Sequence, residues 1–235
     1  AANHAITFDD TDTDMQPDFV WIKNRDATDE HCLFDAQRGA TKVQHIKAGG
    51  EITDTDTLDS FTSDGFQVDA DVKVNTNTED YVAWCWKEST TSGFDIDLFD
   101  GTGATRTEAH GLSAVPHFWV VSRLDEADGS RWCVYHHKNT DAPETDNLQW
   151  STDATTVDVT RTGKQGFSKF GTYEGTGNAD GAFVYTGFRP AFVMMKCIDS
   201  SGTDWNIWDN RRPGYNPNYY VAPNKNIAEV TAHEL

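Results

Sequence analysis

Short apolar runs, separated by polar turns rich in Asp, Asn, Thr and Gly, set the pattern of this chain. Several runs alternate apolar and polar residues, which is typical of half-buried β-strands joined by tight turns. No window places apolar residues at i, i+3, i+4 and i+7 over three turns, and only residues 224–233 are expected to form a helix. The pattern predicts an all-β protein, an antiparallel β-sandwich or jelly roll.

One of these runs occurs three times, at residues 16–26, 115–125 and 189–199. Each copy has a proline, one variable residue, a phenylalanine, an apolar run, a basic residue and an aspartate. The phenylalanines are Phe19, Phe118 and Phe192, which lie 99 and 74 residues apart. Self-similarity in a fixed order indicates an internal repeat. We therefore expect the sandwich to be built from strand–turn–strand repeats.

Further strands are expected around each copy of this run. Alternating segments at 94–99 and 168–173 precede Gly-Thr-Gly turns, and an aromatic strand follows each copy, at 31–35, 132–136 and 206–209. Between the first two copies, residues 63–68 and 79–87 add two more strands. In the second of these, Val82, Trp84 and Trp86 alternate with Tyr81, Ala83 and Cys85, so both faces are apolar. This predicts a central strand covered on both sides.

The spacing divides the chain into three repeats. Residues 1–92 form a first sandwich repeat that lacks its N-terminal strand, 93–166 a shortened second repeat, and 167–235 a third repeat that is incomplete at its C-terminal end. We expect them to pack into one or two sandwich domains. Cut ends would leave unpaired sheet edges, which suggests an excerpt of a longer repetitive chain.

The charge and residue composition of the chain argue against several classes of binding partner. Lys+Arg 19 against Asp+Glu 38 gives a net charge of −19, which argues against binding to nucleic acid or to anionic membranes. No apolar run approaches the ~20 residues of a membrane-spanning helix, so we expect no membrane insertion. Four cysteines lack Cys-x-x-Cys spacing, so we expect small buried hydrophobic residues rather than a zinc site at Cys32, Cys85, Cys133 and Cys197.

A family resemblance rests on motifs in a fixed order. Residues 17–26 (PDFVWIKNRD), 34–39 (FDAQRG), 63–66 (SDGF) and 81–87 (YVAWCWK) resemble a repeat domain of tailed-bacteriophage virion proteins, notably tail fibre-like proteins of marine phages. The resemblance covers nearly the whole chain. It implies a concanavalin A-like lectin sandwich and a structural or adhesive role on the virion.

Candidate catalytic residues lie in the segment Asp95-Ile-Asp97-Leu-Phe-Asp100. Its spacing is similar to the Glu-x-Asp-x-x-Glu strand of jelly-roll β-glucanases. A retaining glycosidase needs two carboxyl groups about 5 Å apart, and alternation places Asp95 and Asp97 on one face of a strand. The third repeat has Lys169, Gly171 and Glu174 at the equivalent positions, so the fold does not require acids there. A solvated strand face is the preferred interpretation.

Binding sites are expected in polar segments. Calcium takes six to eight oxygen ligands, and two acidic loops offer carboxylates, although neither matches an EF-hand; these residues are Asp10, Asp12, Asp14, Asp54 and Asp56. A solvated turn is the alternative, and no other cofactor is expected. Aromatic side chains in polar surroundings stack on sugar rings. The carbohydrate-binding candidates are Trp150, Tyr215, Tyr219 and Tyr220.

Together these features predict a non-enzymatic β-sandwich module of a phage virion appendage that binds host-surface glycans. Its expected partners are other virion proteins and copies of itself, and its expected location is the virion surface, after assembly in the bacterial cytoplasm. One alternative is a capsid decoration or tail structural protein without a ligand. Another is a polysaccharide-cleaving enzyme that uses Asp95, Asp97 and Asp100.

Overall fold

Antiparallel β-structure makes up almost all of the fold. The computed structural model describes residues 3–8, 14–47, 49–125, 132–141, 146–152, 154–158, 172–177, 184–186, 188–212 and 219–231. Within them every pair of neighbouring strands is antiparallel. The one helix among the described residues, α1 (Val72–Asn75), begins after Asp71, whose side chain accepts a hydrogen bond from Lys73 N. The predicted all-β, antiparallel fold class is confirmed.

The N-terminal part forms two sheets. A five-stranded sheet has the order β5-β4-β3-β2-β8, and a three-stranded sheet has the order β1-β7-β6. The strands of the first sheet are β2 (Phe19–Asn24), β3 (Cys32–Asp35), β4 (Lys42–His45), β5 (Ile52–Thr53) and β8 (Tyr81–Trp86). Those of the second are β1 (His4–Thr7), β6 (Leu58–Thr62) and β7 (Gly65–Val68).

These two sheets pack face to face as a sandwich. Alternate residues of β2, such as Val20 and Ile22, point toward β6 and β7 and are 0% and 2% exposed. They share one apolar cluster with Leu58, Phe66 and Val68 of the three-stranded sheet. Because side chains alternate across a strand, the other residues of β2 face away from this cluster, into a second core.

Strand β8 differs from the prediction for residues 79–87. It lies at the edge of the five-stranded sheet, and β2 takes the central place between β3 and β8. On one face Val82 and Trp84 are buried, whereas Ala83 on the other face is exposed. The prediction of a central strand covered on both sides is therefore wrong, because the opposite face receives only partial cover.

Two further sheets contain the second and third copies of the repeated run. The first has the order β12-β11-β10-β9, and the other is the pair β13-β14. Their strands are β9 (Phe118–Val121), β10 (Cys133–His136), β11 (Asp146–Gln149), β12 (Val157–Asp158), β13 (Phe192–Met195) and β14 (Asn206–Asp209). We name β2-β3-β4 the first unit, β9-β10-β11 the second unit, and β13-β14 with its bridging residue Val221 the third unit.

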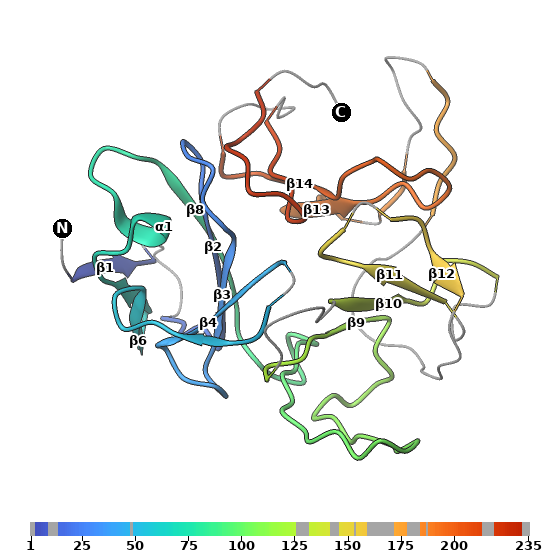
Figure 1. Ribbon diagram of the computed structural model, residues 1–235, viewed down its shortest axis with the longest axis horizontal. Coiled ribbons are helices and arrows are strands. Elements are labelled where there is room, and N and C mark those ends of the chain that lie inside the picture. The colour runs from blue at the N-terminus through green and yellow to red at the C-terminus, as the bar shows by residue number, and fades with distance from the viewer. Residues whose placement is uncertain are drawn as a thin grey trace.

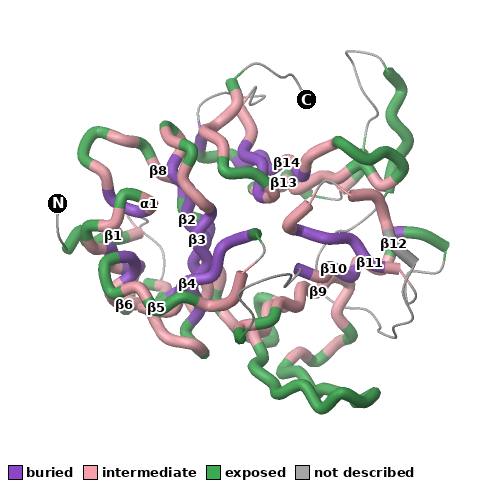
Figure 2. Tube along the Cα trace, in the orientation of Figure 1, coloured by how far each residue is buried: buried purple, intermediate pink, exposed green. Residues whose placement is uncertain are grey.

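The leading hairpins of the three units have closely matching registers. Phe19 lies opposite Asp35, Phe118 opposite His136, and Phe192 opposite Asp209. In Figure 1 the three units surround a common interior. Figure 2 shows that their strands carry much of the buried surface. The central core takes equivalent positions from all three units, among them Trp21, Leu33, Val120, Val134, Met194 and Ile207.

A ring N–H closes each junction between units. The residue before the second strand of one unit donates to a main-chain oxygen in the third strand of another. Trp132 Nε1 donates to His45 O over 3.0 Å, and Trp205 Nε1 donates to Gln149 O over 3.1 Å. His31 Nε2 lies 3.2 Å from Ala222 O. These contacts join second to first, third to second, and first to third, so the three units form a closed ring.

Three local expectations are corrected, and a fourth lies mostly outside the described residues. Residues 95–110 form no strand, and only Phe94 makes a bridge, to Ser89, because no neighbouring strand continues that pairing. In the segment 168–173, residues 168–171 lie outside the described part, and 172–173 are not in a strand. The described residues of 224–233 contain no helix. Of the four free cysteines only Cys32 is fully buried, and Cys197 is exposed.

Candidate functional site

Exposed apolar side chains gather in two segments that precede β9 and β13. We call residues 94–117 the first arm, and residues 172–177, 184–186 and 188–191 the second arm (green and orange in Figure 1). Among the described residues, seven of the nine large hydrophobic side chains that are exposed lie in these arms: Leu98, Phe99, Val115, Tyr173, Val184, Tyr185 and Phe188. Clustered exposed apolar side chains often mark a binding surface, whereas single scattered ones do not.

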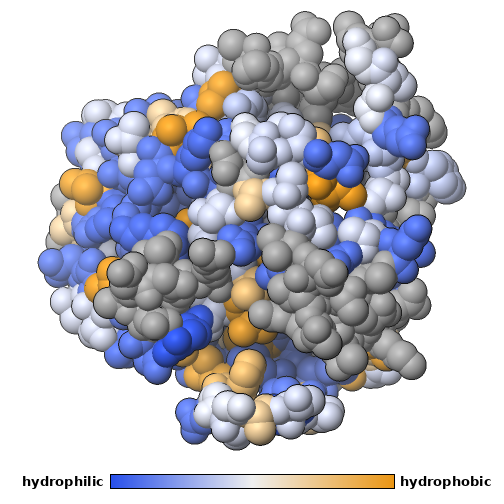
Figure 3. Space-filling view, turned by 45° about the vertical axis from the view of Figure 1, so that its right-hand side comes forward, coloured by the Kyte–Doolittle hydropathy of each residue, from blue (hydrophilic) through white to orange (hydrophobic). Residues whose placement is uncertain are grey.

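Four of these side chains are aromatic. The exposed fractions are 47% for Phe99, 51% for Tyr173, 73% for Tyr185 and 60% for Phe188. The arms line an open hollow of about 3280 Å³ together with β9 and β13, and Phe99, Tyr173 and Phe188 belong to its wall. Figure 3 shows a stripe of hydrophobic residues between hydrophilic surfaces at the lower edge of the molecule. Aromatic faces held at an open surface can stack on sugar rings.

Polar groups flank the aromatic rings of the first arm. The guanidinium of Arg106 lies 5.6 Å from the ring centre of Phe99, and its Nη1 donates to Asp100 O over 2.5 Å. Arg106 also pairs with Glu108. The first arm therefore combines an aromatic ring with a cation and carboxylates, the groups that hydrogen-bond to sugar hydroxyls.

The predicted catalytic carboxylates lie in this arm, but not on a strand. Asp95 Oδ2 accepts a hydrogen bond from Gly111 N over 2.7 Å. Partial burial, followed by the charge of Asp95, raises the pKa of Asp97 above its ordinary value. Partial burial and Asp95 likewise raise the pKa of Glu88. Asp100 is exposed, and it contributes only its main-chain oxygen to the contact with Arg106. The structure thus brings Asp95 and Asp97 together and leaves Asp100 apart.

The predicted carbohydrate-binding residues have other surroundings. Trp150 is 6% exposed and its ring packs edge-on against Trp21 and Trp132, so it is part of the core in this structure. Tyr219 and Tyr220 are half-buried, and the ring of Tyr220 lies 5.8 Å from that of Trp208. Tyr215 lies outside the described residues. Sequence reasoning missed the arm aromatics, although Tyr173 and Phe188 stand near Gly, Thr or Arg rather than in an apolar run.

The predicted calcium ligands are not brought together where the structure describes them. Asp54 Oδ1 accepts from Asp56 N over 3.0 Å, which closes a local turn, and Asp56 is exposed. Asp14 is exposed, and Asp10 and Asp12 lie outside the described residues. Within the described ranges no group of three His, Cys, Asp or Glu side chains could hold a metal ion.

In the part of the chain that is described, no helix is long and apolar enough to cross a bilayer. Comparison with known proteins finds no match among the curated proteins and none among the solved structures. A family model matches residues 4–163 and again residues 160–235. Because the first match alone spans more than half of its length, the chain belongs to the family described as "Domain of unknown function (DUF7483)".

Proposed function

We propose that this protein is a non-enzymatic, adhesive β-sandwich module of a phage virion appendage that binds host-surface glycans. The observation that supports glycan binding most directly is the exposure of Phe99, Tyr173, Tyr185 and Phe188 on two arms. Rings of this kind stack on the apolar faces of sugars. The phage context rests on the resemblance of the repeated motifs to virion proteins, as does the concanavalin A-like form of the sandwich.

The two arms occupy similar places before β9 and β13. This arrangement provides two similar sites at which one glycan chain can bind weakly. Two modest sites on one rigid body raise the overall affinity through their effective concentration. Further copies of the chain and neighbouring virion proteins are the proposed partners, and the virion surface is the proposed location. The division into repeats at residues 1–92, 93–166 and 167–235 belongs to the same proposal.

Immunogold labelling of particles that contain the protein tests the adhesive role. Antibody bound at the tips of tail appendages supports it. Label spread evenly over the capsid, or along a shaft, contradicts it and favours the alternative of a decoration or tail structural protein without a ligand.

The polysaccharide-cleaving alternative has one specific observation in its favour. Asp97, with its raised pKa, stands beside Asp95 in the wall of an open hollow, and two neighbouring carboxyl groups serve as acid and base in glycosidases. If the wild type releases reducing sugars from a polysaccharide and Asp97→Asn does not, the polysaccharide-cleaving alternative replaces the adhesive proposal. Binding without release, in the wild type and in Asp97→Asn alike, would exclude it.

A further inference from the structure

The three ring N–H contacts between units differ in one chemical respect. Two of the donors, Trp132 and Trp205, are indoles that do not titrate. The third, at the junction between the third and first units, is the imidazole of His31. Histidine gains a proton in mildly acidic solution. Of the three equivalent contacts, only that of His31 therefore depends on the protonation of its ring.

The contacts of His31 require its neutral form. Trp21 Nε1 donates to His31 Nδ1 over 2.9 Å, so this nitrogen must keep its lone pair. The proton of the neutral ring is then on Nε2, which donates to Ala222 O. A second proton on Nδ1 would turn an acceptor into a donor and bring two N–H groups face to face. Because His31 is 1% exposed, water cannot replace the lost bond.

The charges around His31 also oppose a proton. Burial, followed by the charge of Lys23, lowers the pKa of His31 to about 3; His45 also lowers this pKa, whereas the bond to Ala222 raises it. Lys23 belongs to β2 and His45 to β4, and the remaining ring contact, Trp21, is uncharged. Among the described residues no carboxylate hydrogen-bonds to this ring. The closed junction therefore excludes the charged imidazole.

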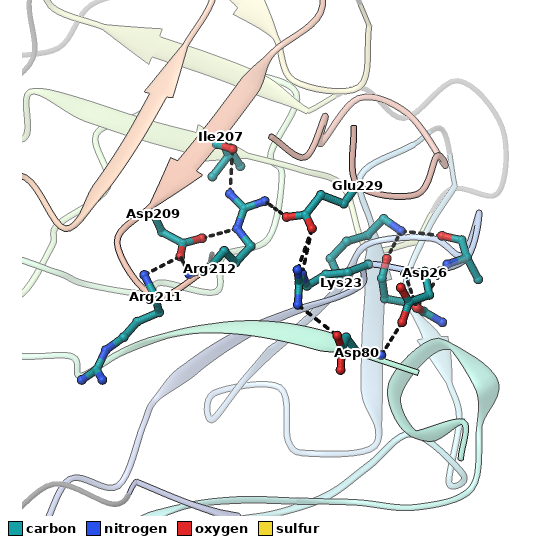
Figure 4. A network of polar contacts seen from close by, with 11 residues as sticks. Lys23, Asp26, Asp80, Ile207, Asp209, Arg211, Arg212 and Glu229 are labelled. Atoms are coloured by element: carbon teal, nitrogen blue, oxygen red, sulfur yellow. Dashed lines mark hydrogen bonds and ion pairs between the residues drawn. The ribbon is translucent and has the colours of Figure 1, made fainter. Parts of the chain in front are cut away.

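The other side of this junction is a strap, which we define as residues 219–231. Its main chain joins the first unit through Glu229 N, which donates to Arg25 O over 2.9 Å. The carboxylate of Glu229 pairs with Arg25 and Arg212, each over 2.7 Å (Figure 4). Arg25 also pairs with Asp80, and Arg212 with Asp209. The strap is thus held to the first unit by Ala222 and by this ionic network.

We propose that the junction between the third and first units is an acid-sensitive contact, at which protonation of His31 releases the strap while the two tryptophan junctions stay closed. The open form exposes His31 to water and binds a proton that the closed form excludes. Below a pH of about 6.5, the ordinary pKa of histidine, the open fraction grows by up to about tenfold for each pH unit.

Hydrogen exchange of the intact chain at pH 7.5 and 5.0, corrected for intrinsic exchange rates, tests this. The strap amide of Glu229, which donates to Arg25 O, reports on the acid-sensitive junction, whereas the amide of Val221 reports on the pairing of the strap with Ile207 of its own unit. The amides of Glu51 and Trp150, which donate to Leu124 O and Trp132 O, report on the second unit and its contact with the first. We expect the opening equilibrium of the strap to rise about thirtyfold at pH 5.0 and that of Glu51 and Trp150 to change less than about threefold.

Two variants separate His31 from its titratable neighbour. His31→Gln keeps one donor and one acceptor without titrating, and it should make strap opening independent of pH. His45→Gln, which removes the imidazole that donates to His31 O over 2.9 Å, should keep the acid response. Equal opening at all junctions, or a strap that ignores pH in the wild type, would overturn the proposal. If His31→Gln fails to fold, the test rests on the wild type at the two pH values. There the amides of Glu51 and Trp150 serve as internal controls for the strap amide of Glu229.

Discussion

Arg212 donates through Nε to Oδ2 of Asp209 over 2.7 Å, and the two side chains are only 3% and 6% exposed. Arg212 also donates through Nη2 to Ile207 O, two residues before the aspartate. The first unit repeats this geometry, since Arg38 pairs with Asp35 and donates to Leu33 O. In the second unit the corresponding places hold His136 and Asn139. An Asp-x-x-Arg turn thus follows the second strand of the leading hairpin in two of the three units.

Asp209→Asn should destabilise the protein by about 3 kcal/mol, because it removes one of the two carboxylates that pair with the buried guanidinium of Arg212. Chemical denaturation measures the free energy of unfolding. Asp125→Asn is the matched control, since it breaks the exposed pair with Arg123 and should cost less than about 1 kcal/mol. Equal costs for the two substitutions would contradict a structural role for the turn.

Gly65→Ala should be among the most damaging single-methyl substitutions. Gly65 has a φ of +128°, and a Cβ atom there would lie 2.0 Å from Ile6 O, where β7 pairs with β1. Gly39, with a φ of +100° and nothing within 4 Å of its Cβ position, isolates the effect of the backbone angle. We expect thermal unfolding to show a loss of about 1 kcal/mol for Gly39→Ala and clearly more for Gly65→Ala. Similar melting temperatures would mean that the β1–β7 contact is not this close.

Trp150→Ala tests whether this side chain belongs to the core. Its ring packs 4.9 Å from that of Trp21 and 5.6 Å from that of Trp132. Truncation of a buried tryptophan leaves a cavity and should cost about 3–5 kcal/mol. Tyr185→Ala, at a side chain that is 73% exposed, should change stability by less than about 0.5 kcal/mol. A fully stable Trp150→Ala would restore this residue as a surface candidate.

Stability should fall in mild acid, with His31 as a main cause. Its pKa is about 3 in the folded protein against about 6.5 when unfolded, so the unfolded chain binds more protons between these values and stability is lost as the pH falls below 6.5. Burial and two neighbouring histidines also lower the pKa of His136, to about 4. Urea unfolding at pH 7.5 and 5.0 should show a loss of about 2 kcal/mol from His31. The same loss in His31→Gln would assign the acid response to other groups.

The strands were predictable because their signal is local. Alternation and the Pro-x-Phe run located β2, β9 and β13, since a half-buried strand needs only its own side-chain pattern. Residues 94–99 show the limit of that reasoning: Asp95, Asp97 and their apolar neighbours alternate as a strand does, but only Phe94 finds a bridging partner. Strand formation also requires a neighbour, which alternation within one segment does not specify.

The candidate site was harder to predict because exposure depends on distant segments. Trp150 stands in a polar stretch, but Trp21 of β2 and Trp132, which precedes β10, cover it. The order of the strands in the five-stranded sheet, with β8 at its edge, depends on contacts between distant segments in the same way. By contrast Tyr173, Tyr185 and Phe188 lie outside any strand and remain exposed.

A glycan array, followed by calorimetry on the best ligand, tests the central claim that the arm aromatics bind host-surface sugars. We expect the wild type to bind. The double variant Tyr185→Ala/Phe188→Ala and the single variant Phe99→Ala should each lose at least about tenfold in affinity. The reason is that stacking of a ligand ring on an aromatic side chain contributes about 1–3 kcal/mol. The control Ile52→Ala with Val72→Ala removes exposed apolar side chains outside the arms and should bind as the wild type does. No binding to any glycan, or equal binding by all the folded variants, would contradict the account.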